Sequence, residues 1–306
     1  MREKSLFNSV LFQIAFTLSI IASVIFDFYN KMGLPSRTSL SGFIKNLDVN
    51  PLVNMVLNSA IFIIVGLVTI YFGRKFKLIE RNKDYALVFF LFSFLYHNVL
   101  LSSITIIIPC LLMVLVFGLF LQIYNQSSVQ KILFYASVLI SISTFFDIIF
   151  SLYLLLLLAG NFIIRPLIIK DFLVCLLAFV LPFLYYSAWL FVTDQPQFVL
   201  DSIEFNFQEL SIGNWVFVAV LGFIILQSFV ARSKMIAQQR DQMSFMVLIA
   251  LVSLALGLFY NQDFLFLAVV PSAYFASNFY NALGKKWIVD SIVLLLFVLY
   301  PLLKFI

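Results

Sequence analysis

The sequence predicts an all-α fold, a polytopic integral membrane helix bundle of about eleven transmembrane helices. The first observation is composition, since 63% of the residues are hydrophobic and only 11% are charged. Soluble domains are about half apolar and about a quarter charged, and no water-soluble fold has enough interior to bury so much apolar surface. The second observation is the recurrence of apolar segments close to the length that crosses a bilayer. The third is the placement of the basic residues between them.

The apolar segments are separated by polar or charged connectors. The stretch 131–164 is compatible with two short helices or with one kinked helix. The N-terminal apolar run has no small-residue cleavage site after it, so we interpret it as a retained first span rather than a signal peptide. The predicted spans cover residues 6–26, 51–72, 85–98, 103–123, 132–147, 149–164, 172–193, 214–231, 244–260, 264–281 and 287–304.

Basic residues fall almost entirely on alternate connectors. Of the nineteen Lys and Arg residues, only Lys31, Arg37, Lys45 and Lys304 lie on one predicted side of the membrane. Cytoplasmic loops carry an excess of Lys and Arg, so the other side is predicted to be cytoplasmic. This arrangement predicts a cytoplasmic N-terminus and a C-terminus on the opposite, outer side of the membrane. The net charge of +5 resides in these loops, and we expect no nucleic-acid partner.

Several common chemistries have no support in the sequence. Cys110 and Cys175 both lie in apolar segments, which argues against a disulfide framework, and the single histidine, His97, excludes a multi-histidine metal centre. No glycine-rich phosphate loop and no serine-hydrolase elbow is present. Small residues four apart, in Ser137 with Ser141 and in Ser253 with Gly257, predict close helix packing.

The predicted outer loop 27–50 carries three candidate site residues. Asp27 directly follows the first span, where a carboxylate can act as an acid or base, hold a divalent cation, or simply mark the membrane boundary. Arg37 and Lys45 are basic residues on the predicted outer side of the membrane, where Lys and Arg are unfavourable. Their presence there is explained by binding of a lipid phosphate or, equally, by charge balance with the acidic residues of the loop.

Other candidates lie at the same predicted face. His97 at the end of the third span is a candidate general base or phosphate ligand, or an ordinary interfacial side chain. Asp147 is a candidate functional carboxylate or, as the better interpretation, a helix-end or hairpin-turn residue. The outer loop 193–214 has no basic residue and carries four acidic candidates for binding a cation or an acceptor, namely Asp194, Asp201, Glu204 and Glu209.

The layout resembles the GT-C superfamily of polytopic glycosyltransferases, which use polyprenyl-phosphate or -pyrophosphate sugars at the outer face of the membrane. The similar features are a first span ending at Asp27, an amphipathic outer loop and six further spans. The basic inner loop 73–84, the short third span and the helical hairpin before Arg165 are also similar. The resemblance covers residues 1–215, and residues 216–306 are predicted to add transmembrane helices to the same domain. The chain also resembles uncharacterised, Phe-rich inner-membrane proteins of Bacteroidota. These resemblances imply a bacterial inner-membrane location, in which the outer side is periplasmic and so is the C-terminus.

The resemblance implies binding of a polyprenyl-phosphate-linked sugar at the outer face, together with membrane lipid, and it raises transfer of that sugar as the activity. Asp27 and His97 are then the catalytic candidates, Arg37 and Lys45 the lipid-phosphate ligands, and a divalent cation the candidate cofactor. Asp27 is a single acid where the superfamily often has an acidic pair, and the first outer loop is shorter than usual. These two departures favour a second hypothesis, a non-catalytic subunit or scaffold bound to an envelope protein partner. A third hypothesis is an uncoupled lipid or solute transporter.

Overall fold

The structure is a computed structural model, and it describes residues 51–78, 104–125, 129–165, 168–193, 205, 207, 210, 212–232, 236–282 and 291. All regular structure in these residues is helical, which confirms the all-α prediction for this part of the chain. The α-helices are α2 (Pro51–Lys75), α4 (Ile104–Gln122), α5 (Gln130–Thr144), α6 (Leu152–Ile164), α7 (Ile169–Val192), α8 (Ile212–Arg232), α9 (Ala237–Phe259) and α10 (Leu265–Ala282). Three short 3₁₀ helices are η3 (Ile123–Asn125), η4 (Ile148–Ser151) and η5 (Gln262–Phe264).

The described helices coincide with eight of the predicted spans, and α5 and α6 show that the stretch 131–164 forms two helices. The predicted spans 6–26, 85–98 and 287–304 lie outside the described residues, apart from Ser291 in the last of them. Three helices are long and apolar enough to cross a membrane, within Val56–Lys75, Ile169–Val192 and Ala237–Phe259. Membrane association therefore has structural support, while the total of eleven spans and the orientation of the termini stay predictions.

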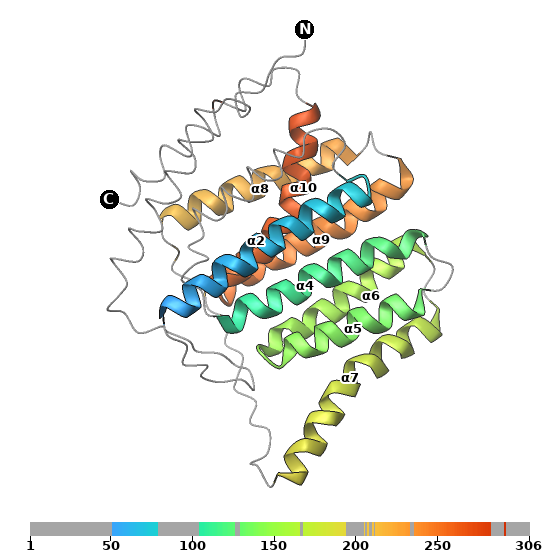
Figure 1. Cartoon of the computed structure of the whole chain (residues 1–306). Helices are drawn as coiled ribbons and strands as arrows, with labels where there is room; N and C mark the ends of the chain where they lie inside the picture. Colours follow the sequence, from blue (N-terminus) through green and yellow to red (C-terminus); the bar gives the residue numbers. More distant parts are fainter. Residues whose placement is uncertain are drawn as a thin grey trace.

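The helices form two layers (Figure 1). One layer holds α2, α4, α5 and α7 in that order, and the other holds α8, α10, α9 and α6. Contacts of α10 with α4 and α2 join the layers, and α7 lies at the edge, packed mainly on α5. The short connections after α4, α5, α6, α8 and α9 reverse the direction of the chain, so different sets of residues lie at the two ends of the bundle.

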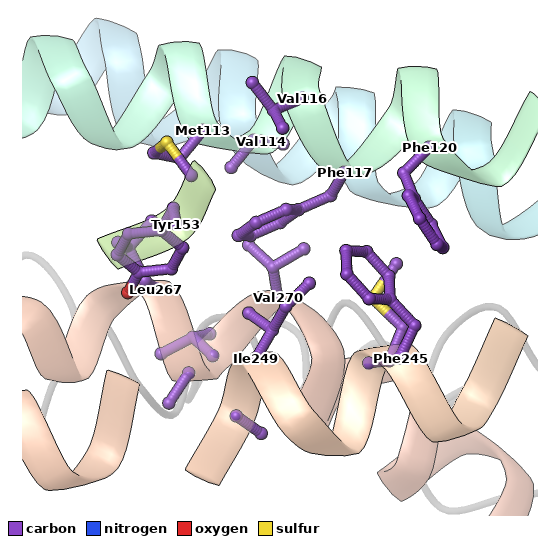
Figure 2. Packing of buried hydrophobic residues seen from close by; sticks show 14 of the residues in the cluster. Met113, Val114, Val116, Phe117, Phe120, Tyr153, Phe245, Ile249, Leu267 and Val270 are labelled. Carbon is purple, nitrogen blue, oxygen red and sulfur yellow. The ribbon is translucent and has the colours of Figure 1, made fainter. Parts of the chain in front are cut away.

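The core lies between the layers, around α10. The stretch from Phe264 to Phe275 is buried on every side because its sequence is apolar or small all round. Figure 2 shows Phe117 and Phe120 of α4 pointing at Phe245 of α9 and at α10. Lipid tails are as apolar as these side chains, so close van der Waals packing rather than transfer from water stabilises this core within a bilayer.

A few hydrogen bonds cross between helices. The Tyr153 and Ser253 hydroxyls lie 2.7 Å apart, the Ser141 hydroxyl donates to the Phe179 carbonyl at 2.7 Å, and the Tyr274 hydroxyl donates to the Thr69 carbonyl at 3.0 Å. Such bonds contribute on average about 0.6 kcal/mol each inside a membrane. Ser141 and Ser253 are thus buried at close helix contacts, which confirms the packing interpretation of these small residues.

Gly160 of α6 gives a direct test of this packing. A methyl group there would overlap the rings of Phe245 and Phe120, whose centroids stack 3.5 Å apart and which therefore have little room to move. Gly160→Ala is expected to destabilise the protein by about 1–3 kcal/mol, measured as thermal unfolding in mild detergent. Gly222→Ala on α8 is the matched control, since a methyl group there meets nothing within 4 Å. Equal melting temperatures for the two variants would contradict this packing.

The two ends of the bundle differ in charge. One end, which we call the basic end, comprises residues 74–78, 121–125, 129–131, 161–165, 168–171, 232 and 236–242 and carries every described Lys and Arg. There the Gln239 amide donates to the Lys77 carbonyl at 3.1 Å, joining α9 to the end of α2. The polar residues that begin α9 form helix ahead of the predicted apolar span because they are good helix formers. The opposite end, which we call the turn end, comprises residues 144–151, 205, 207, 210, 212–215 and 259–264.

Candidate functional site

The residues predicted to form a site lie outside the described residues, so their roles and mutual distances stay predictions. They are Asp27, Arg37, Lys45, His97, Asp194, Asp201, Glu204 and Glu209. The candidate site that the structure does describe is built around Asp147 at the turn end.

Asp147 begins the 3₁₀ helix η4 in the turn between α5 and α6. Its backbone is extended, with φ −152° and ψ 126°, and its Oδ1 accepts a hydrogen bond from the Ile149 N–H at 3.0 Å. A carboxylate suits this position because it satisfies a backbone donor that has no helical partner. The hairpin-turn interpretation of Asp147 is therefore confirmed.

The carboxylate of Asp147 also has a tertiary partner. The Tyr260 hydroxyl, at the end of α9, lies 3.0 Å from Oδ1 and 2.9 Å from Oδ2 and donates to this carboxylate. Asp147 is only 1% exposed, and burial of a carboxylate is costly unless donors satisfy it. A hydrogen bond to a charged group is stronger than one between neutral groups, so this contact fixes the α5–α6 turn against the end of α9.

The turn between α9 and α10 has the same local structure as the turn that holds Asp147. Asn261 has φ −149° and ψ 125°, and its Oδ1 accepts from the Asp263 N–H at 3.0 Å. Each turn continues to a buried phenylalanine three residues later, and the rings of Phe150 and Phe264 lie 5.0 Å apart. The two hairpins therefore meet through equivalent positions, joined by the Tyr260 hydrogen bonds.

Exposed aromatic side chains surround this pair of turns. The Phe205 ring lies 6.0 Å from the Tyr260 ring, and the Phe207 ring lies 5.9 Å from Trp215 and 5.8 Å from Phe259. Phe205 and Phe207 are each 58% exposed, and Trp215 is 44% exposed. Trp and Tyr are typical of the boundary between lipid and water because their rings carry a polar group, and Trp215 and Tyr260 fit that pattern.

The electrostatic character of the turn end is acidic. Asp147 and Asp263 lie there, and no Lys or Arg of the described residues does. Within those residues no group of three His, Cys, Asp or Glu side chains is arranged to hold a metal ion. The described carboxylates alone thus do not form a cation site, and Asp27 and the acidic residues of loop 193–214, which lie outside the described residues, stay candidates.

A second buried carboxylate lies at the basic end. Asp171, in the first turn of α7, forms a salt bridge with Arg165, the residue that ends α6. Asp171 is 1% exposed, and the Arg165 side chain is 25% exposed. This pair joins α6 to α7 across the residues between them, so we assign it a structural role.

Sequence reasoning did not identify Tyr260 or Asn261. A short pattern carries the signal: Phe, an aromatic residue, Asp or Asn, two further residues and Phe occur as FFDIIF from Phe145 and as FYNQDF from Phe259. Six residues are too few to establish a repeat without the matching backbone. Comparison with known proteins adds nothing to this pattern, because no family model, curated protein or solved structure matches the chain.

Proposed function

We propose that this protein binds a polyprenyl-phosphate-linked sugar at the turn end of the bundle, on the outer face of a bacterial inner membrane, and transfers the sugar. The observation that carries the proposal is the group of exposed aromatic rings beside the acidic turns, which the buried Asp147–Tyr260 contact holds together, at the end opposite the basic residues. Under the positive-inside rule the basic end is cytoplasmic, so the turn end faces outward.

The two parts of such a ligand, an apolar chain and a polar sugar, match two kinds of surface: the apolar outer faces of the helices and the acidic, aromatic surface of the turn end. A polyprenyl chain is apolar and lies in the lipid, against helices whose outward side chains are apolar, such as α7. A sugar presents hydroxyl groups to carboxylates and C–H faces to aromatic rings. Phe207 and Trp215 provide exposed rings, stacked with an interplanar angle of 29°.

The proposal divides the roles between two sets of residues. Asp147 and Tyr260 are assigned a structural role and no role in the chemistry. The Asp147 carboxylate is already occupied by hydrogen bonds from the Ile149 N–H and from the Tyr260 hydroxyl, and these bonds join the α5–α6 turn to the end of α9. Asp27 is the proposed acid, base or metal ligand, and Arg37 with Lys45 binds the lipid phosphate, since cations on the outer side match a phosphate group.

Asp27→Asn tests the catalytic part of the proposal. We expect this variant to lose transfer of radiolabelled sugar from a polyprenyl-phosphate hexose to endogenous membrane acceptors, because an amide neither takes up a proton nor balances a cation. Folding should be unchanged, as judged by thermal unfolding of the purified variant. Asp48→Asn, in the same loop, is the control and should retain transfer. Transfer by Asp27→Asn at the parent rate would refute the catalytic assignment.

A further inference from the structure

The side-chain amide of Asn161 is a buried polar group that the outer-face function does not use. Asn161 lies in the last turn of α6 and is fully buried, and neither its Oδ1 nor its Nδ2 has a hydrogen-bond partner among the described residues. Buried amides without partners are costly and therefore rare in native proteins. Each of these atoms thus calls for a partner that the described part of the chain does not supply.

Gln242 of α9 is a second group of this kind at the same level of the bundle. Its Nε2 donates to the Leu121 carbonyl at 3.1 Å, while its buried Oε1 has no partner among the described residues. Gln242 precedes Phe245 by one turn, and Leu121 follows Phe120. The rings of Phe120 and Phe245 lie next to each other (Figure 2), with centroids 3.5 Å apart. Both rings pack against Gly160, the neighbour of Asn161.

Arg165 is a third residue with an atom of this kind. Its backbone N–H donates to the Asn161 carbonyl at 3.0 Å, and its side chain forms the salt bridge with Asp171, while its Nε has no partner among the described residues. The end of α6 therefore presents two donors, Asn161 Nδ2 and Arg165 Nε, and one acceptor, Asn161 Oδ1. Helix α9, which packs against α6, presents a second acceptor, Gln242 Oε1.

We propose that ordered water molecules bind between α6 and α9 at the basic end, accepting hydrogen bonds from Asn161 and Arg165 and donating to Asn161 and Gln242. The amides are fully buried, so the ligand is small. The protein atoms mix donors with acceptors, and Asp171 already balances the Arg165 charge, so a neutral ligand that both donates and accepts fits better than an ion. Buried water typically makes about two to four hydrogen bonds to such groups.

Water-edited solid-state NMR of the full-length, ¹⁵N-labelled protein in lipid bilayers tests this proposal directly. The Asn161 side-chain amide signal, assigned by its loss in Asn161→Leu, should receive magnetisation from water much faster than the backbone amide of Leu157. Leu157 is a suitable dry reference because it is buried one turn earlier on the same helix. Transfer to Asn161 as slow as transfer to Leu157 would overturn the proposal.

Thermal unfolding of the same variant gives a second readout. Asn161→Leu should lower the melting temperature by about 3 °C or more, because leucine expels the water that also satisfies Gln242 and Arg165. Leu157→Met is the control for general disturbance of α6 and should have little effect. A higher melting temperature for Asn161→Leu would overturn the proposal, and so would a lower one without water contact in the NMR experiment.

Discussion

Replacement of Arg165 by leucine is expected to destabilise the bundle by about 3–5 kcal/mol, since it leaves the Asp171 carboxylate buried without its cation. The measurement is the free energy of unfolding of the purified protein in mixed micelles, followed by circular dichroism. Removing one partner of a buried ion pair costs more than removing both, because the remaining charge has neither water nor a counter-ion.

The double variant Arg165→Leu/Asp171→Leu should therefore recover much of the stability that the single variant loses. Arg240→Leu is the matched control, because Arg240 lies at the same end of the bundle but its side chain is half exposed and 3.9 Å from Asp241. Exposed ion pairs contribute little to stability, so this control should unfold like the parent protein. No recovery in the double variant would show that the salt bridge is not what joins α6 to α7.

Loss of the Tyr260 hydroxyl is the second large expected effect. Tyr260→Phe removes the donor that lies 2.9–3.0 Å from both oxygens of the buried Asp147 carboxylate, and we expect a destabilisation of about 1.5–3 kcal/mol. Tyr135→Phe is the control, since Tyr135 on α5 is 59% exposed and its hydroxyl is free to bond with solvent or headgroups.

A double-mutant cycle of Tyr260→Phe with Asp147→Asn separates this contact from the other roles of both residues. Asparagine retains an acceptor for the Ile149 N–H but removes the charge. The two substitutions should be clearly non-additive, with a coupling energy of about 0.5–3 kcal/mol. Additive effects would mean that the two turns are held together by their apolar contacts alone.

The helices could be predicted from the sequence because each one is a long apolar run bounded by polar residues. The sequence does not decide whether the helix breaks between α5 and α6, because FFDIIF is itself apolar enough to continue a helix. Only the extended backbone at Asp147 and its N-terminal cap identify the break. The predicted span 244–260 begins seven residues after the start of α9, because hydropathy marks lipid-embedded residues and does not detect a helix that continues into a polar segment.

The described part of the site was predictable only in part. The position of Asp147 at a hairpin turn follows from one carboxylate between two apolar runs. Its contact with Tyr260 joins residues 113 positions apart, and no local pattern encodes such a pairing. The same limit applies to Asn161 and Gln242, whose polarity is visible in the sequence but whose burial depends on the packing of α6, α4 and α9.

Native mass spectrometry of the protein in nanodiscs made from its own membrane tests the proposed function most directly. We predict a co-purifying polyprenyl phosphate or its glycosylated form, which is lost in the Arg37→Ala/Lys45→Ala variant and retained in a Lys131→Ala control at the basic end. Bulk phospholipid or a protein partner as the only bound species would contradict the proposal and favour a non-catalytic scaffold.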